Sequence, residues 1–312
     1  MLTLFACPKA FTGLTGVIQW NAIRSWTELH RDCQVVLLGD DPGTSIAADE
    51  LRVAHIPHVA RNEYGTPLVS AIFSEAERVA RYELMCYVNA DIILTSDLLP
   101  AVSAVRREHA RFLLLGRRRD LTLTGKLDFA DGWETQLRER AKTQGKLHGP
   151  TGLDYFVFVR GSVGGLPPFA IGRPGWDNWL VYRARALGLP IIDATQRVLV
   201  VHQNHDYGHH PGKMAGVFKG PEAQANATLM GGMLQGYTRA LTARDADQTL
   251  TPNGLTPNRS LYRHYRALVK RSESDRRLRL VVILVRAVRR SWSGLLSAVR
   301  KLIQGDHNVL VD

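Results

Sequence analysis

Short apolar runs alternate with longer amphipathic stretches through the first half of the chain. The apolar runs, which predict buried strands, are residues 2–7, 34–38, 53–56 and 84–88. The stretches between them with helical spacing of apolar residues are 17–30, 46–51 and 67–81. Strands that alternate with helices are typical of βαβ units. We therefore expect an α/β protein with a Rossmann-like, mainly parallel central sheet flanked by helices.

The second half of the chain follows this pattern less regularly. Its predicted strands are residues 112–115, 155–159, 191–192 and 198–202. A helix is predicted at 176–187, where Gly188 and Pro190 end it. The pattern indicates one α/β domain over residues 1–220.

The last fifty residues carry a different pattern. From residue 278 to residue 303 the apolar positions form a helical stripe, and most of the arginines lie on other faces. The longest apolar run, 280–285, is far shorter than the ~20 residues of a membrane-spanning helix. We expect residues 221–312 to form a C-terminal helical extension with a basic amphipathic tail. The tail either lies on an anionic membrane surface, which its charge favours, or packs on the domain or a second subunit.

The formal net charge of +11 is concentrated in that tail. Residues 259–312 hold 13 Lys and Arg against 4 Asp and Glu, so the rest of the chain is nearly neutral. This distribution argues against nucleic acid as a partner and for an anionic partner of the tail. The three cysteines are isolated, which indicates free thiols, and the N-terminal residues lack a signal-peptide pattern. We expect a cytoplasmic protein, peripheral on the inner face of the membrane.

The strand predicted at 84–88 ends in Asn89-Ala90-Asp91, directly before another apolar run. Ligands of open α/β sheets bind outside the carboxyl ends of strands. In an extended chain the side chains of Asn89 and Asp91 would point the same way. Their oxygens suit Mg²⁺ or Mn²⁺, which would hold a diphosphate. The alternative is a turn in which the two residues only cap the following element.

A Gly/Pro-rich loop brings Asp177 to the start of the predicted helix, between Trp176 and Trp179. Asp177 is either a functional carboxylate or an N-cap, and the two roles are compatible. The tryptophans either stack on a sugar or belong to the core.

Histidines follow the strand predicted at 198–202. His202 ends the strand, and His205 lies three residues further on. Imidazole suits Mn²⁺ as a ligand. The alternatives are a separate zinc site, which no nearby cysteine supports, or ordinary loop residues that contact phosphate or sugar.

Two arginine-containing segments could contact phosphate. Arg61 precedes the predicted helix at 67–81, where it would meet phosphate or belong to a plain loop. The run Arg117-Arg118-Arg119 is expected to be solvated, as most charge runs are.

The order and spacing of these features over residues 1–210 resemble the GT-A class of nucleotide-sugar glycosyltransferases. In that class a DxD-like motif closes a central strand; here Asn89-Ala90-Asp91 stands in its place and lacks the first carboxylate. The resemblance implies that Asn89 and Asp91 hold metal and diphosphate. It also implies that Pro8 after the first strand and Asp40 after the second line the nucleoside pocket.

The same resemblance implies roles for residues further along the chain. Asp154 and Trp176 would bind the sugar, and Asp177 would be the general base of an inverting reaction. His202, and after it His205, would join Asp91 as metal ligands.

The implied function is transfer of a sugar from a nucleotide-diphosphate donor to a hydroxyl of a glycan, lipid or small-molecule acceptor, with Mn²⁺ or Mg²⁺ as cofactor. The chain contains no Gly-rich dinucleotide fingerprint, Walker A loop or nucleophile elbow, so NAD, ATP and hydrolase chemistry lack support. A sugar-phosphate nucleotidyltransferase is the alternative enzyme. A catalytically inactive, membrane-associated scaffold is the alternative without activity.

Overall fold

The computed structural model describes residues 1–205, 213–232, 240–263, 265, 268 and 278. Met1–Asn258 form one compact unit and Arg259–Asp312 a second. Apart from its first residue, the amphipathic stripe expected at 278–303 lies outside the described residues. Among the described residues, no helix is both long and apolar enough to cross a bilayer.

The first unit is built around a nine-stranded sheet of order β13-β12-β10-β6-β9-β4-β1-β2-β3. The strands are β1 Leu2–Ala6, β2 Gln34–Leu38, β3 Ala54–Ile56, β4 Leu84–Val88, β6 Leu113–Arg117, β9 Leu153–Val159, β10 Ile191–Asp193, β12 Gln248–Thr251 and β13 Gly254–Pro257. Most neighbouring pairs are parallel. The exceptions are β9, antiparallel to both β4 and β6, and β13, antiparallel to β12. The prediction of a mainly parallel α/β sheet is confirmed.

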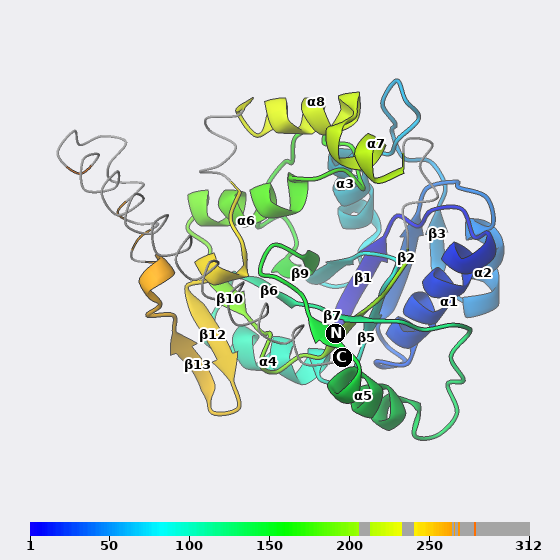
Figure 1. Ribbon diagram of the computed structural model, residues 1–312, viewed down its shortest axis with the longest axis horizontal. Coiled ribbons are helices and arrows are strands. Elements are labelled where there is room, and N and C mark those ends of the chain that lie inside the picture. The colour runs from blue at the N-terminus through cyan, green and yellow to red at the C-terminus, as the bar shows by residue number, and fades with distance from the viewer. Residues whose placement is uncertain (206–212, 233–239, 264, 266–267, 269–277, 279–312) are drawn as a thin grey trace, which may run out of the picture. The chain divides into compact units, whose positions relative to one another are not determined.

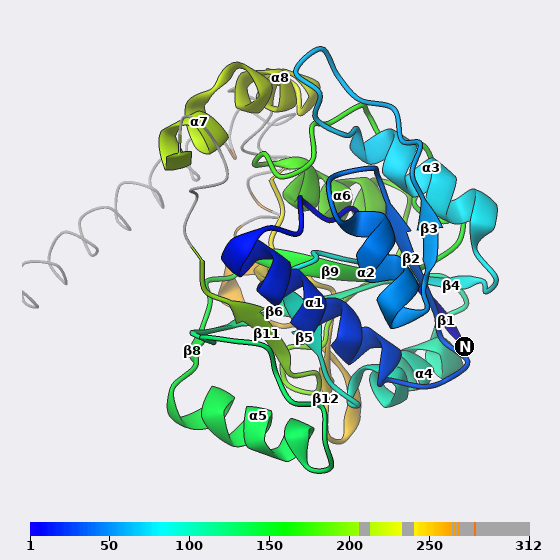
Figure 2. The ribbon, with the colours of Figure 1, turned by 90° about the vertical axis from the view of Figure 1, so that its right-hand side faces the viewer.

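Helices cover both faces of this sheet (Figures 1 and 2). The described helices are α1 Gly13–Thr27, α2 Thr44–Leu51, α3 Val69–Val79, α4 Leu98–Glu108, α5 Trp133–Thr143, α6 Trp176–Ala186, α7 Lys213–Lys219 and α8 Pro221–Leu229; of these, α5 packs on the second, smaller sheet described below. The side chains of β1 alternate between the two faces, as the pleat of a strand requires. Leu2 and Leu4 pack in a core with α1, α2 and α4, whereas Phe5 packs in a core with α3 and α6.

The antiparallel direction of β9 decides where its first residues lie. Val88 at the end of β4 pairs with Tyr155 near the start of β9. The amino end of β9 therefore lies at the same edge of the sheet as the carboxyl end of β4. As a result the Asn89 backbone N–H donates to the Asp154 carbonyl at 2.9 Å.

A second, four-stranded sheet has the order β5-β11-β7-β8. Its strands are β5 Ile92–Leu94, β7 Arg119–Leu121, β8 Lys146–Leu147 and β11 Val200–Gln203. The pairing register places His202 of β11 beside Ile92 on one side and beside Asp120 on the other. Three segments far apart in the sequence thus meet at one point, next to the turn that carries Asp91.

The first unit continues past the boundary that the sequence placed at residue 220. After α8 the chain forms a short 3-10 turn, Ala243–Asp245, and then the hairpin β12–β13, which extends the central sheet beside β10. The residues up to Asn258 are therefore part of the α/β unit and not of a separate helical extension. The short, weakly apolar strands at 248–257 gave no clear periodic signal in the sequence.

Candidate functional site

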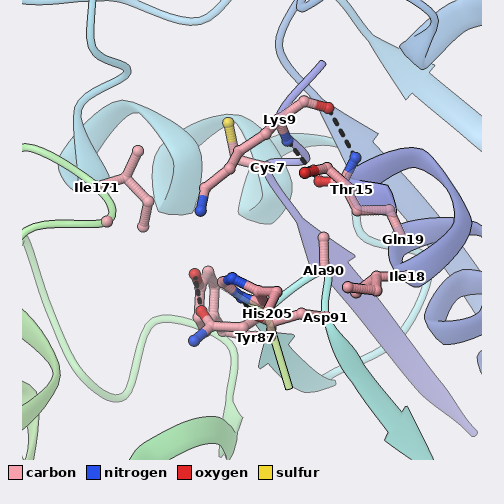
Figure 3. Close-up of a pocket in the computed structure, with 12 residues that line it drawn as sticks. Cys7, Lys9, Thr15, Ile18, Gln19, Tyr87, Ala90, Asp91, Ile171 and His205 are labelled. Atoms are coloured by element: carbon pink, nitrogen blue, oxygen red, sulfur yellow. Dashed lines mark hydrogen bonds and ion pairs between the residues drawn. The ribbon is translucent and has the colours of Figure 1, made fainter. Parts of the chain in front are cut away.

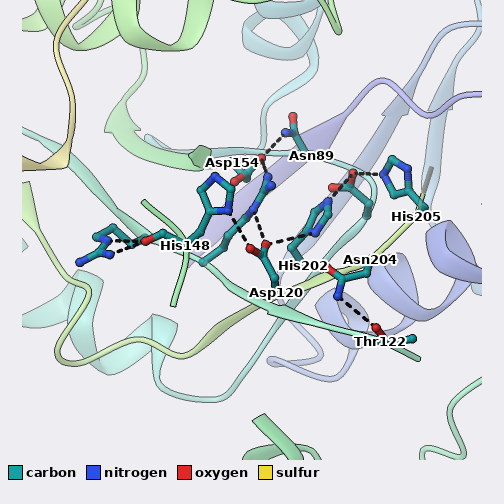
Figure 4. A network of polar contacts seen from close by, with 11 residues as sticks. Asn89, Asp120, Thr122, His148, Asp154, His202, Asn204 and His205 are labelled. Carbon is teal, nitrogen blue, oxygen red and sulfur yellow. Dashed lines mark hydrogen bonds and ion pairs between the residues drawn. The ribbon is translucent and has the colours of Figure 1, made fainter. Parts of the chain in front are cut away.

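Asp91, His202 and His205 converge at the edge of the small sheet. One ligand atom from each lies within 4.8 Å of the others. The Asp91 Oδ2 atom is 3.2 Å from His205 Nε2 and 3.6 Å from His202 Nε2. Figure 4 shows the imidazoles of His202 and His205 near one another, and their ring centroids are 5.4 Å apart. The structure thus brings together the three residues that the sequence nominated as metal ligands.

The state of Asp91 suits a cation ligand. Burial alone would raise the pKa of Asp91, but the charge of His202 and the interactions with both histidines hold it well below its usual value. Its second oxygen, Oδ1, is buried and has no hydrogen-bond partner among the described residues. A buried carboxylate oxygen left without a partner is costly. The ionised group with one spare oxygen therefore fits a divalent cation shared with the two imidazoles.

Asp120 lies behind His202. The His202 Nδ1 atom is 3.4 Å from Asp120 Oδ1, on the side of the ring opposite Asp91. In this structure His202 Nδ1 has no hydrogen-bond partner among the described residues; a carboxylate that accepted from this nitrogen would fix the tautomer that leaves the other nitrogen available to a metal. His148 Nδ1 is 2.7 Å from the other oxygen of Asp120 and so holds this carboxylate in place.

Arg118 extends the network into the central sheet. It donates to Asp120 Oδ1 and to Asp154 Oδ1, each at 2.9 Å, and only 18% of its side chain is exposed. Burial would lower the pKa of Arg118, but the neighbouring carboxylates raise it. The expectation of a solvated arginine run is wrong for Arg118, because this residue between β6 and β7 directs its side chain toward these two aspartates.

Asn89 faces a different set of side chains from Asp91. The Asn89 carbonyl accepts from the Ile92 N–H at 3.1 Å, so residues 89–92 form a tight turn. The Asn89 amide donates to Asp154 at 2.8 Å and accepts from the Tyr87 hydroxyl at 2.7 Å. The expectation that Asn89 and Asp91 point the same way is wrong, because it assumed an extended chain.

A pocket opens beside Asp91 (Figure 3). Its lining residues are Cys7, Lys9, Thr15, Ile18, Gln19, Tyr87, Asn89, Ala90, Asp91, Ile171, Gly172 and His205. They come from the segment after β1, from α1, from the β4–β5 turn and from the loop before α6. The pocket thus lies at the carboxyl ends of β1 and β4, where open α/β sheets bind their ligands.

Asp177 lies in the first turn of α6. Its neighbour in the chain, Trp176, packs on Tyr87 of β4. Burial raises the pKa of Asp177 to about 7; backbone N–H groups at the helix start oppose this rise, and the charge of Asp154 adds to it. The side chain stays partly exposed. A carboxylate with these properties can exchange a proton near neutral pH.

The tryptophans of α6 are core residues. Trp176 is 5% exposed and packs edge-on against Tyr87, with ring centroids 4.9 Å apart. Trp179 is also buried and packs on Phe169. The expectation that Trp176 or Trp179 stacks on a sugar is wrong, because α6 turns this face toward the central sheet. Gly175 permits the sharp entry into α6: it has a φ of 104°, and a Cβ there would collide with Met230.

Pro8 and Asp40, which the resemblance implied for the nucleoside pocket, are not among the residues that line the pocket beside Asp91. Pro8 is buried between Cys7 and Lys9, which both line the pocket. Asp40 is largely exposed and forms an ion pair with Arg61, which is also 3.2 Å from Asp41. Arg61 therefore binds carboxylates of its own chain.

Sequence reasoning did not nominate Asp120, His148 or Lys9. Asp120 directly follows an arginine run, and His148 stands in a stretch without apolar periodicity. Their significance depends on the β7–β11 pairing, which no local pattern shows. For Lys9 there was a signal, its place directly after the first strand.

No protein-family model and no curated protein matches the sequence. Solved structures do match. TarS of S. aureus in complex with UDP-GlcNAc has 13% identity and a TM-score of 0.49, over 74% of this chain and 64% of that chain. The match thus spans less than two thirds of the TarS chain.

Glucosyl-3-phosphoglycerate synthase of Mycobacterium tuberculosis in complex with phosphoglyceric acid has 16% identity and a TM-score of 0.46, over 74% of this chain and 79% of that chain. The same enzyme in complex with Mg²⁺ and UDP has 14% identity and a TM-score of 0.44 over 74% and 78%. These structures are GT-A-type nucleotide-sugar glycosyltransferases, the class that the sequence resembles. At these identities and TM-scores, the likeness assigns no donor, acceptor or site residue to this chain.

Substituting Asp120 tests whether this carboxylate orients His202. We expect Asp120→Asn to weaken Mn²⁺ binding by about 10-fold or more, as loss of a carboxylate behind a metal-binding histidine does. Titration calorimetry of the purified protein with Mn²⁺ measures the change. Asp131→Asn removes an equal charge from an exposed position and should bind like the wild type. Wild-type affinity in Asp120→Asn would show that His202 needs no such partner.

Proposed function

We propose that this chain is a nucleotide-sugar glycosyltransferase that uses a divalent cation. The observation that carries the proposal is the convergence of Asp91, His202 and His205 beside a pocket at the carboxyl edge of the sheet. A divalent cation there would supply positive charge to the diphosphate of the donor. The chain's own residues provide one carboxylate and two imidazoles to hold that cation.

The transfer would proceed by direct displacement with inversion. The acceptor oxygen forms a bond to the anomeric carbon of the sugar, and the bond from that carbon to the diphosphate oxygen breaks. The electron pair of the broken bond stays on the diphosphate, and the proton of the acceptor hydroxyl goes to Asp177. The raised pKa of Asp177 and its partial exposure support this role.

The Asp154 network would hold the site in shape. Asp154 accepts from both Asn89 and Arg118, and its second oxygen is buried without a hydrogen-bond partner among the described residues. We propose that Asp154 acts on the sugar site through its contact with Asn89, which lines the pocket. The acceptor would be a hydroxyl group of a glycan, a lipid or a small molecule.

Donor binding tests the proposal directly. A thermal-shift screen of nucleotide-sugars with and without Mn²⁺ or Mg²⁺ should give a metal-dependent stabilisation by one donor. Asp91→Asn should lose that stabilisation and the release of nucleoside diphosphate, because the ionised ligand is gone. His202→Gln provides a second variant if Asp91→Asn folds poorly.

The matched control for this screen is Asp49→Asn, which changes an exposed carboxylate on α2. It should behave like the wild type in both measurements. Full turnover in Asp91→Asn would eliminate the mechanism. If no donor binds to the wild type with either metal, an inactive scaffold becomes the better interpretation; synthesis of a nucleotide-sugar from nucleoside triphosphate would instead identify a nucleotidyltransferase.

The pH dependence tests Asp177. The base must be ionised, so turnover should rise with pH up to about 7 and then level, and Asp177→Asn should lose turnover. The same group links stability to pH: because the folded protein binds this proton more tightly than the unfolded chain, stability falls as pH rises from about 4 to about 7.

Asp177→Asn removes that fall. It should therefore be more resistant to urea than the wild type at pH 8, while the difference shrinks toward pH 4. Urea unfolding at the two pH values measures this effect, and donor stabilisation should persist. An Asp177→Asn protein that transfers sugar at the wild-type rate would exclude Asp177 as the base.

We also propose that the basic segment 259–312 holds the protein at an anionic membrane surface on the cytoplasmic side. The segment holds 13 basic and only 4 acidic residues, and this charge supports the proposal. The full chain should cosediment with vesicles that contain anionic lipid and not with neutral vesicles, and salt should release it. Equal recovery with both kinds of vesicle would contradict the proposal.

A further inference from the structure

Lys9 brings a positive charge into the pocket beside Asp91. It follows β1 directly and lines the pocket together with Asp91 and His205. Figure 3 shows its side chain extending from the backbone above Tyr87 and Asp91 toward the open space beside Ile171. Lys9 is an exposed residue, so a bound ligand can reach its side chain.

The backbone of Lys9 is held firmly. Gln19 of α1 accepts from the Lys9 N–H at 2.7 Å and donates to the Lys9 carbonyl at 2.8 Å. Gln19 itself is 3% exposed. A buried amide that binds both polar groups of one residue fixes the point from which the lysine side chain starts, so its reach into the pocket is set by the fold.

The Lys9 ammonium has no hydrogen bond or ion pair with any residue in the described part of the chain. The pKa of Lys9 is lowered, mainly by desolvation. The charge of Asp91 opposes this lowering, and the charge of Arg173 increases it. Arg173, in contrast, is held by Glu222 at 2.5 Å. Lys9 is therefore a partly desolvated cation without a carboxylate of its own.

The charge of the neighbouring cluster makes such a cation useful. The triad of Asp91, His202 and His205 contains a single carboxylate, because residue 89 is an asparagine, whose side-chain amide donates to Asp154. One carboxylate attracts a divalent cation less strongly than two. A weakly held metal would neutralise the charge of the diphosphate only in part. An ammonium fixed next to the diphosphate would neutralise a further part of that charge.

We propose that Lys9 binds the diphosphate of the donor directly and stabilises the additional charge that it gains when the sugar leaves. This inference rests on the proposed function. In the displacement described above, the electron pair of the broken bond stays on the diphosphate, whose terminal phosphate gains roughly one negative charge. The ammonium donates a hydrogen bond to that phosphate and remains protonated throughout, so it contributes more to the departing nucleotide than to the intact donor.

Binding without metal separates Lys9 from the metal ligands. Inorganic pyrophosphate is titrated in a calorimeter into the full chain in EDTA. The wild type should bind it, and Lys9→Met should bind at least about 10-fold more weakly, the loss expected for one charge-assisted hydrogen bond. Lys9→Arg keeps the charge and should retain most of the affinity. Lys142→Met, at an exposed position on α5, is the control and should match the wild type.

A second measurement uses the donor found in the thermal-shift screen. Lys9→Met should weaken inhibition by the product nucleoside diphosphate more than it raises KM for the donor, because only the product carries the extra charge. A structural role of Lys9 would move both values together.

Equal pyrophosphate affinity in Lys9→Met and the wild type, or no binding to the wild type, would overturn the inference. The proposed function has its own criterion, metal-dependent donor binding that Asp91→Asn abolishes. A protein that passes this criterion and fails the pyrophosphate test is a transferase in which Lys9 has no such role.

Discussion

The pairing of β11 between β5 and β7 is the constraint on which the candidate site depends. This register puts His202 beside Asp120 on one side and beside the strand that follows Asp91 on the other. A shift of one residue would turn His202 to the opposite face of the small sheet. The core around Val201 and Leu121 resists such a shift, because these side chains are buried under α5 on the other face.

Acidic side chains alternate with nitrogen-bearing side chains through the site from one sheet to the other. Asp91 is next to His202, His202 is next to Asp120, and Arg118 joins Asp120 to Asp154. Each side chain in this series is largely removed from water and depends on its neighbours for polar contacts, so the loss of one member leaves another without a partner. The series thus couples the shape of the edge that carries Asp91, His202 and His205 to the end of β4 and the start of β9.

The sequence predicted the strands of the first βαβ units well, because each is a compact apolar run bounded by turn residues. It also nominated Asp91, His202 and His205, which the structure brings together. Three predictions were wrong for a common reason: each depended on a tertiary detail that the local sequence does not fix. The orientation of Asn89 depends on a turn, the burial of Trp176 on which face of α6 meets the sheet, and the burial of Arg118 on its contacts with two aspartates. Composition at those positions is compatible with either outcome. Asp120 matters through contacts across long stretches of sequence, which local patterns do not reveal.

Glu222 has a consequence for how the chain can be divided. This residue of α8 is 6% exposed and binds Arg173 and Asn62, which belong to two separate loops. A fragment truncated at residue 220 would keep the Arg173 guanidinium without its carboxylate and would lack the hairpin that completes the sheet. Any shortened version intended for crystallisation or for separating the first unit from the basic segment should therefore extend at least to Asn258, since the loop before α6 takes its shape from residues that come later in the chain.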